Sequence, residues 1–314
     1  MKKQLKVLLV DAFTSTPDKG NRAGVVLDAT GLNEAEMQAI AALVNVSETA
    51  FMIPTPEASG HELQVRYFTP SIEVPTCGHA TVGAHYARSI HLGLADTTVT
   101  ALIGAGPLPV DIVGSGDQMK IVMTQGAVVF SEPYEEAMTS RILSALGLTL
   151  NDLEPGLPVQ EVSTGHSKVM VPIRSVQKLD ALTPDMKALA ECSRLMNCNG
   201  FFVFAINGAE SRYLTCGRMF APAIGIDEDP VTGNGNGPCG AYLSKYGRLP
   251  DQAVFSYFGQ QGVAMGKEGE IEVTVHRKDG LPHKVQVGGV AVEAGTMDVE
   301  LSLDDDGCVL ANEV

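Results

Sequence analysis

A segment in the first half of the chain recurs in the second half. Arg66–Ile72 (RYFTPSI) matches Arg218–Ile224 (RMFAPAI), with Arg, Phe, Pro and Ile identical at a spacing of 152 residues. A few residues later Pro75–His79 matches Pro230–Asn234, and a helical pattern follows each match. Similarity that recurs at one spacing indicates two copies of one structural unit.

Two upstream matches keep the same order. They pair Gly20–Val26 with Gly165–Val171 and Phe51–Ile53 with Phe204–Ile206. A repeat of about 150 residues is too long for a solenoid, so the matches predict two similar domains. Equivalent loops of two such copies are expected to line one cleft, and clefts between domains are favoured ligand sites.

Apolar runs rich in β-branched residues alternate with helical patterns along the chain. Strands are expected at 7–13, 25–27, 50–53, 63–68, 121–124, 169–173, 201–206, 271–275 and 285–287. Helices are expected at 80–90, 135–146, 184–196 and 237–246, and after Asn33, which forms a capping pair with Glu36. The pattern predicts an α+β fold. The first half is expected to span 1–125, completed by roughly the last 15–20 residues, and the second half 126–295.

Composition and charge narrow the classes of function. The chain has 314 residues, 45% hydrophobic and 19% charged, which suits two packed domains and excludes general disorder. Its net charge of −15 argues against nucleic acid and anionic membranes as partners. No apolar run approaches the ~20 residues of a membrane span, and the apolar run near the N-terminus is interpreted as a strand and not as a signal peptide. The six cysteines have no metal-ligand spacing, which favours reduced thiols and a cytoplasmic location.

The loop Cys77-Gly78-His79 leads into the helix expected at 80–90 in the first half. It can be an ordinary glycine turn. Alternatively, His79 lies at the positive end of the helix dipole, where its imidazole can hydrogen-bond a substrate. Because the second half repeats this loop, we favour the functional interpretation.

The corresponding loop in the second half contains Asp229 and the glycine-rich run 233–237. Glycines let a backbone approach a ligand closely, although the same run can be a flexible surface turn. Two helix N-termini of this kind predict a binding site for an anionic group. One of the carboxylates Glu228 and Asp229 is expected to face His79.

Ser47-Glu48-Thr49 precedes an apolar strand. Glu48 is either a capping residue or a proton-transfer group held in a poorly solvated pocket. The chain lacks the GxGxxG, P-loop, HExxH and GxSxG motifs, and its seven histidines are scattered. The chemistry suggested is proton transfer with no cofactor and no metal.

At these residues the sequence resembles the PhzF family of phenazine-biosynthesis-like isomerases and, within it, the YddE-type bacterial proteins. The matching stretches are Val10–Thr14, Gly20–Asn21, Ser47–Phe51, Arg66–Pro75, Cys77–Thr81, Gly217–Pro222 and Glu228–Gly233. The resemblance implies a diaminopimelate-epimerase-like fold, in which each half is a β-sheet wrapped around a central helix.

The resemblance also implies an activity: cofactor-free isomerisation of a dihydro-hydroxyanthranilate, in which a glutamate moves a proton between ring carbons. Carried over by position, the implied catalytic residues are Glu48, His79 and Asp229. The implied substrate-binding residues are Asn21, Cys77, Gly78, Thr232, Gly233 and Asn234. The expected partner is a small anionic molecule, and a homodimer is left open.

Three features depart from the family pattern: Asn234 replaces a usual Ser, Arg22 replaces a frequent Pro, and His166–Lys168 is polar where relatives are often apolar. These differences bear on the identity of the substrate more than on the acid–base residues.

A cysteine-dependent amino-acid racemase is an alternative, with Cys77 as one thiol. The position equivalent to Cys77 in the second half is Thr232, and Cys239 lies within the predicted helix. A non-catalytic metabolite-binding protein is the third interpretation.

Overall fold

The structure, a computed structural model, describes residues 3–56, 60–304 and 308–314. It divides into two compact units: residues 1–123 with 288–314 form unit 1, and residues 124–287 form unit 2. The boundaries expected from the sequence are 125 and 295. No described helix has the length and apolar character that crossing a membrane requires.

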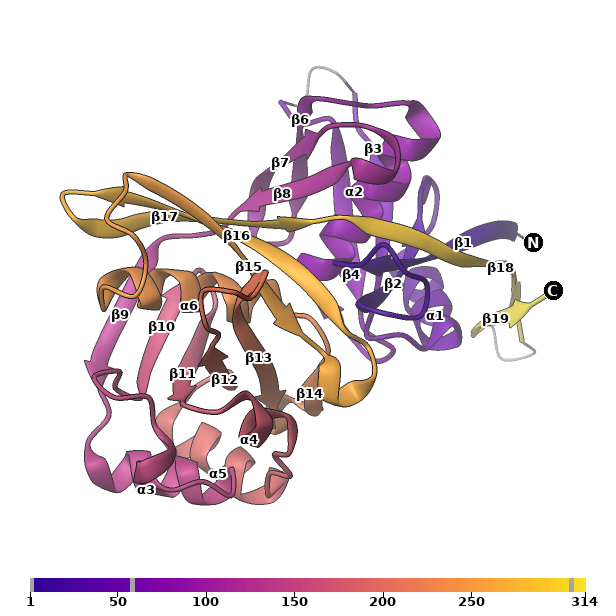
Figure 1. The fold of residues 1–314 in the computed structure, drawn as a ribbon. Coiled ribbons are helices and arrows are strands. Elements are labelled where there is room, and N and C mark those ends of the chain that lie inside the picture. Colours follow the sequence, from indigo (N-terminus) through magenta and orange to yellow (C-terminus); the bar gives the residue numbers. More distant parts are fainter. Residues whose placement is uncertain (1–2, 57–59, 305–307) are drawn as a thin grey trace. The chain divides into compact units, whose positions relative to one another are not determined.

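Unit 1 combines a twisted sheet with two helices (Figure 1). Its helices are α1 (Glu34–Val44) and α2 (Gly78–Leu92). Its strands are β1 (Lys3–Ala12), β2 (Asn21–Val26), β3 (Glu48–Pro54), β4 (Leu63–Phe68), β5 (Glu73–Val74), β6 (Thr97–Ile103), β7 (Gly106–Val113), β8 (Lys120–Thr124, which ends at the unit boundary), β18 (Ala291–Leu303) and β19 (Val309–Glu313). The long strand β18 pairs with β1, so the last segment of the chain completes the first unit.

Unit 2 has the same kind of architecture (Figure 1). Its helices are α3 (Glu136–Ala145), α4 (Val176–Asp180), α5 (Met186–Met196) and α6 (Gly233–Lys245). Its strands are β9 (Val128–Pro133), β10 (Gln160–Thr164), β11 (Ser167–Ile173), β12 (Phe201–Ile206), β13 (Tyr213–Ala221), β14 (Ile226–Asp229), β15 (Val254–Gln261), β16 (Gly269–Lys278) and β17 (Leu281–Gly289, which continues into unit 1).

The strand pairings of the two units repeat. In unit 1, β2 is parallel to β3, β3 antiparallel to β4, β4 antiparallel to β5 and parallel to β6, and β6 antiparallel to β7. In unit 2, β11 is parallel to β12, β12 antiparallel to β13, β13 antiparallel to β14 and parallel to β15, and β15 antiparallel to β16. The internal sequence repeat therefore corresponds to a duplicated topology, which confirms the predicted fold class of two pseudo-symmetric halves.

Each unit is built around one buried helix, α2 in unit 1 and α6 in unit 2. Glycines let the sheet approach α6 closely: a Cβ added at Gly240 would lie 2.6 Å from Cγ1 of Val273. The helix predicted at 237–246 in fact begins at Gly233. Its glycines disfavour a helix locally, and burial on nearly every side compensates for that preference.

An arginine–glutamate clamp in each unit shows the repeat at the level of side chains. Arg66 donates from Nε and Nη2 to both carboxylate oxygens of Glu73, at 2.7 and 2.6 Å. Arg218 binds Glu228 in the same way, at 2.8 and 2.7 Å. Each guanidinium also lies over the phenylalanine two residues further on, 5.1 and 5.0 Å from the ring centroid. The clamp ties the loop before each central helix to the sheet. It gives Glu228 a structural role as the partner of Arg218.

Candidate active site

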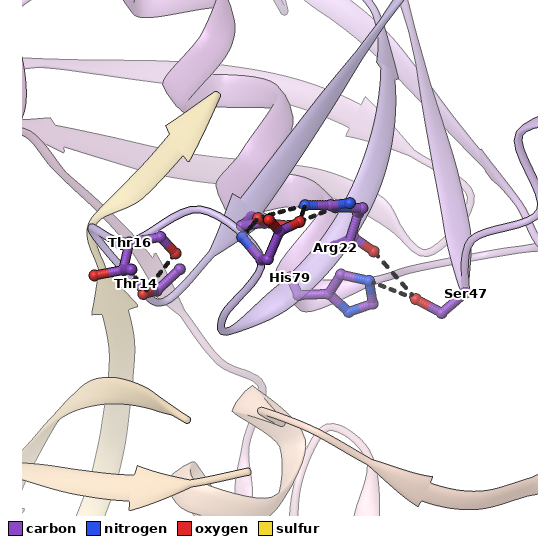
Figure 2. Close-up of polar contacts among 7 residues, drawn as sticks. Thr14, Thr16, Arg22, Ser47 and His79 are labelled. Carbon is purple, nitrogen blue, oxygen red and sulfur yellow. Dashed lines mark hydrogen bonds and ion pairs between the residues drawn. The ribbon is translucent and has the colours of Figure 1, made fainter. Parts of the chain in front are cut away.

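His79 lies in the first turn of α2, and its ring is held by a hydrogen-bonded chain from the neighbouring strands. Ser47 Oγ is 3.1 Å from His79 Nε2 and donates to the carbonyl oxygen of Arg22 at 3.4 Å (Figure 2). A hydroxyl has one proton, so while it donates to Arg22 its oxygen accepts from His79 Nε2–H. This arrangement leaves Nδ1 of His79 as an acceptor.

Glu48 is the first residue of β3, and its carboxylate lies beside the same ring. Glu48 Oε2 is 3.3 Å from His79 Nε2, and the two side chains are 15% and 8% exposed. Oε2 is buried and accepts no well-formed hydrogen bond from the described residues. The Oε2 atom therefore adjoins the imidazole of His79 and accepts no capping hydrogen bond from a described backbone N–H.

Cys77 is the N-cap residue of α2, but its side chain makes no capping hydrogen bond. Its Sγ lies 3.5 Å from Nδ1 and 3.9 Å from Nε2 of His79. The hydroxyl of Thr81 donates to the Cys77 carbonyl oxygen at 2.6 Å, which satisfies a backbone acceptor at the start of the helix. Cys77, His79 and Glu48 thus form one cluster, in which one ligand atom of each lies within 4.8 Å of the others.

The strand that carries Arg22 is fixed by a buried ion pair. Arg22 donates from Nε and Nη2 to the carboxylate of Asp11, at 2.7 and 2.8 Å, and from Nη2 to exposed Asp18 at 2.8 Å. The hydrogen bond to Asp11 is the main reason that the pKa of Arg22 is raised above its ordinary value. Asn21 is buried at the start of β2, beside this pair. Arg22 therefore has a structural partner that a proline at this position would lack.

In unit 2 the corresponding loop is organised by Gln261, a residue that the sequence analysis missed. Thr232, the N-cap residue of α6, donates its hydroxyl proton to Asp229 Oδ2 at 2.5 Å. Gln261 Nε2 donates to the Asp229 carbonyl oxygen at 2.8 Å, and Gln261 Oε1 accepts from the Thr232 N–H at 3.0 Å. The Asp229 side chain is thus held at the N-terminus of α6. A lone glutamine in a strand gives no sequence signal of this role.

A second amide that the sequence analysis missed fixes the first turn of α6. Gln125 Nε2 donates to the Gly233 carbonyl oxygen at 3.1 Å and to Asn234 Oδ1 at 3.3 Å. Gln125 Oε1 in turn accepts from the hydroxyl of Thr164 at 2.7 Å. The side chain of Asn234 is therefore engaged with a neighbour where family members usually have Ser.

His166 and Lys168 form a polar pair in the same unit. Lys168 Nζ lies 2.8 Å from His166 Nδ1 and donates to the Ser167 carbonyl oxygen at 3.0 Å. Burial lowers the pKa of Lys168 to about 8, and the charge of Asp229 partly counteracts this shift. Burial, with the neighbouring ammonium, lowers the pKa of His166 to about 4. These residues place a weakly basic amine on the unit that carries Asp229.

The thiols of unit 2 are poorly placed for proton transfer. Cys239 is fully buried in α6, and this burial raises the pKa of its thiol well above the ordinary value. The equivalent of Cys77 is Thr232: both are the N-cap of the central helix in their unit. The pair of equivalent positions therefore offers one thiol and one hydroxyl that is bonded to Asp229.

Comparison with known proteins identifies the family. The family model described as phenazine biosynthesis-like protein (PhzC-PhzF) matches residues 10–296. The chain is 48% identical over 288 residues to a protein of Escherichia coli K12 named uncharacterized isomerase YddE, covering 91% of this chain and 95% of that protein. It is 29% identical over 293 residues to trans-2,3-dihydro-3-hydroxyanthranilate isomerase of Pseudomonas fluorescens, covering 92% and 96%.

Solved structures agree with this assignment. The crystal structure of a PhzF-family protein from Bacillus anthracis has a TM-score of 0.84 and 31% identity, over 95% of this chain and 99% of that one. A hydroxyproline epimerase from Agrobacterium vitis shares the fold alone, with a TM-score of 0.61 and 12% identity over 97% and 94% of the two chains. By sequence, duplicated topology and structural likeness, the chain belongs to the PhzC-PhzF family of phenazine biosynthesis-like proteins and is a PhzF-like isomerase.

Proposed function

We propose that the protein is a cofactor-independent isomerase that moves a proton between two carbons of a small carboxylate-bearing metabolite. Glu48 is the general acid and base: it removes a proton from one carbon and delivers one to another. The observation that carries this proposal is the position of Glu48 Oε2, which is buried, lies 3.3 Å from His79 Nε2 and accepts no well-formed hydrogen bond from the residues that the structure describes. A carboxylate in such a place can exchange a proton with a substrate carbon.

His79 orients the reacting part of the substrate and stabilises charge during transfer. Its ring is held by Ser47 and lies against Cys77 Sγ, so little reorganisation is needed when charge develops. The backbone N–H groups at the start of α2, beginning at Gly78, are suited to a carboxylate because a helix N-terminus carries partial positive charge. Asn21 and Cys77 complete the binding residues proposed in unit 1.

In unit 2 the proposal assigns Asp229 to the same substrate, together with Thr232, Gly233 and Asn234 as binding residues. This assignment draws on the duplicated sequence and topology and on the family relationship. The substrate class is a small cyclic or amino-acid-like carboxylate. A relative named trans-2,3-dihydro-3-hydroxyanthranilate isomerase supports that class, since its named substrate is a cyclic amino acid.

The proposal is tested with Glu48→Gln, which preserves shape but cannot exchange a proton. Turnover and uptake of carbon-bound deuterium are measured in deuterated water, with trans-2,3-dihydro-3-hydroxyanthranilate and a panel of small cyclic carboxylates. With an accepted substrate, kcat should fall by at least ~10² while binding stays within about tenfold. Glu313→Gln, an exposed change in β19, is the matched control. Undiminished deuterium uptake by Glu48→Gln would remove Glu48 from the mechanism.

The alternative, a thiol-dependent racemase, is favoured by one contact, that of Cys77 Sγ with His79 Nδ1 at 3.5 Å. A hydroxyl does not replace a thiolate as base without activation, and Thr232 stands at the equivalent position in unit 2. The variant Cys77→Ser distinguishes the Glu48-dependent isomerase from the thiol-dependent racemase. Our proposal expects most of the turnover to remain, whereas the racemase alternative expects it to be lost with the fold intact. A binding protein would show affinity without any deuterium exchange.

A further inference from the structure

We propose that Glu48, Cys77 and His79 form a Zn²⁺ site within unit 1, and that an ion bound there blocks the proton transfer assigned to Glu48. The blocking effect rests on the proposed function. The site itself rests only on the geometry of unit 1, where one ligand atom of each residue lies within 4.8 Å of the other two. The three donors are a thiol, an imidazole and a carboxylate.

The spacing of two of the donor atoms suits zinc. Tetrahedral Zn²⁺ binds nitrogen and oxygen at about 2.0 Å and sulfur at about 2.3 Å, which separates the donor atoms by roughly 3.3–3.6 Å. In the structure His79 Nε2 is 3.3 Å from Glu48 Oε2 and 3.9 Å from Cys77 Sγ. Nε2 therefore already has the oxygen at the tetrahedral spacing. The sulfur lies nearer to Nδ1, at 3.5 Å, than to Nε2, so the Cys77 side chain must turn to reach an ion bound at Nε2.

Zinc binding requires rearrangement at two donors: the Cys77 side chain turns, and Nε2 of His79 exchanges its proton and its hydrogen bond with Ser47 for the ion. Glu48 Oε2 accepts no well-formed hydrogen bond within the described part of the chain, so coordination would satisfy a buried atom and break no such bond at that oxygen. The positive end of α2 opposes a cation, but two negatively charged ligands, thiolate and carboxylate, outweigh the partial charge of a helix terminus.

The chemical types of the three donor atoms favour zinc over magnesium and calcium. Thiolate and imidazole are ligands of zinc and related transition metals, whereas magnesium and calcium take oxygen ligands. Three protein ligands leave a fourth position for water or for a substrate carboxylate. Because thiolate is the ligand form of cysteine, binding releases the Cys77 proton and strengthens as pH rises.

Occupation of the site would stop the proposed reaction. A carboxylate bound to zinc through Oε2 cannot collect a proton from carbon at that oxygen. Coordination through Nε2 would also displace the hydrogen bond between His79 and Ser47. Zinc is therefore expected to inhibit turnover and to compete with substrate, with activity restored by a chelator.

The site is tested with Co²⁺ as a spectroscopic substitute for Zn²⁺, titrated into the full chain. We expect one ion per chain, a thiolate-to-cobalt charge-transfer band in the near ultraviolet and tetrahedral d–d bands, all removed by added Zn²⁺. Cys77→Ser should abolish the charge-transfer band. Cys308→Ser, which removes an exposed thiol outside the cluster, should leave it unchanged. Glu48→Gln should weaken Zn²⁺ binding by roughly 100-fold or more, since even a partner behind a metal ligand is worth 10–100-fold.

The outcomes separate this proposal from the proposed function, because the titration needs no turnover. Absence of the band, its survival in Cys77→Ser or its loss in Cys308→Ser would overturn the site. If Cys77→Ser does not fold, which circular dichroism would show, Glu48→Gln decides the matter by its Zn²⁺ affinity. Metal binding that leaves turnover unaffected would overturn the blocking effect alone. Full turnover by Glu48→Gln would overturn the proposed function and leave the metal titration valid.

Discussion

Ser47 Oγ lies 3.1 Å from Nε2 of His79 and donates to the Arg22 carbonyl oxygen. Arg22 in turn is anchored to buried Asp11. A serine one position before the proposed acid–base residue Glu48 thereby connects the two strands at the site to the histidine of α2. The proton assignment that follows, with Nε2 as donor and Nδ1 facing Cys77, makes Ser47 a positioning residue for His79.

Replacement of Ser47 by Ala is expected to loosen the ring and mix the two tautomers of His79. One lost hydrogen bond of about 1–1.5 kcal/mol corresponds to roughly a tenfold fall in kcat, with KM changed little. Nitrogen-15 NMR of the histidine ring reports the tautomer directly. Ser71→Ala, an exposed change, is the control. An unchanged tautomer in Ser47→Ala would show that Ser47 does not set it.

The acid stability of the protein is expected to depend on His85 in α2. This side chain is fully buried, and neither ring nitrogen has a hydrogen-bond partner among the described residues. Burial, with the nearby charge of Arg88, lowers the pKa of His85 to about 3 from 6.5. Between these values the unfolded chain binds a proton that the folded chain does not, so stability falls as pH falls through this window.

One such proton contributes about 1.4 kcal/mol per pH unit to that slope. His85→Leu should therefore flatten the acid limb of stability against pH between about 6 and 4, as measured by urea unfolding at a series of pH values. His283→Gln changes an exposed histidine and should leave the slope as it is. An equal slope in His85→Leu and the unchanged protein would contradict the assignment.

The two arginine clamps are expected to differ in their contribution to stability. Arg218 is 7% exposed. It donates from Nη1 to the carbonyl oxygens of Leu179 and Leu182, and from Nε and Nη2 to Glu228. Its removal leaves a buried carboxylate unpaired, so Arg218→Met should cost about 3–5 kcal/mol. The equivalent change at the more exposed Arg66 should cost about 1 kcal/mol or less.

Urea unfolding followed by circular dichroism measures both costs, since the chain has no Trp to serve as a fluorescent probe. Adding Glu228→Gln to Arg218→Met should recover part of the loss, because the unpaired charge is then removed. Equal costs at the two arginines would show that burial does not distinguish the clamps.

Two glycines of α6 should respond differently to alanine. A Cβ at Gly235 would lie 2.5 Å from Cδ2 of Phe202, whereas a Cβ at Gly233 would lie 3.4 Å from the nearest side-chain atom. Overpacking against a buried ring costs about 1–3 kcal/mol and exceeds the gain of up to about 1 kcal/mol in helix propensity. Gly235→Ala should therefore lower the free energy of unfolding, and Gly233→Ala should change it by under about 0.5 kcal/mol. Thermal unfolding of the two variants gives the comparison.

The internal repeat and the local patterns determined much of the fold in advance. The matching segments around Arg66 and Arg218 predicted two similar units, and the strand pairings repeat accordingly. Helix α1 begins after Asn33 with a capping box to Glu36, as that pair predicts. These features are local or repeated, so neighbouring residues carry enough information to specify them.

Other elements could not be predicted because distant partners determine them. The strands at 97–103 and 106–113 were not expected, and the last segment was expected to complete the first half without the bounds of its strand, 291–303. Strand 291–303 pairs with β1 at the other end of the chain, and that pairing supplies its hydrogen bonds and its buried face. The glycine-rich start of α6 is likewise helical because of what packs around it.

For the candidate site, the sequence determined which residue types are present, and the tertiary structure alone determined which of them meet. Cys77 and His79 are neighbours on α2, but Glu48 is 29 residues away in the sequence. It reaches the ring because β3 pairs in parallel with β2, with Glu48 opposite Ala23, and because α2 packs against both strands. Strand register and helix packing decide such contacts, and spacing along the chain does not encode them. A donor set of carboxylate, thiol and imidazole therefore exists only in the folded unit.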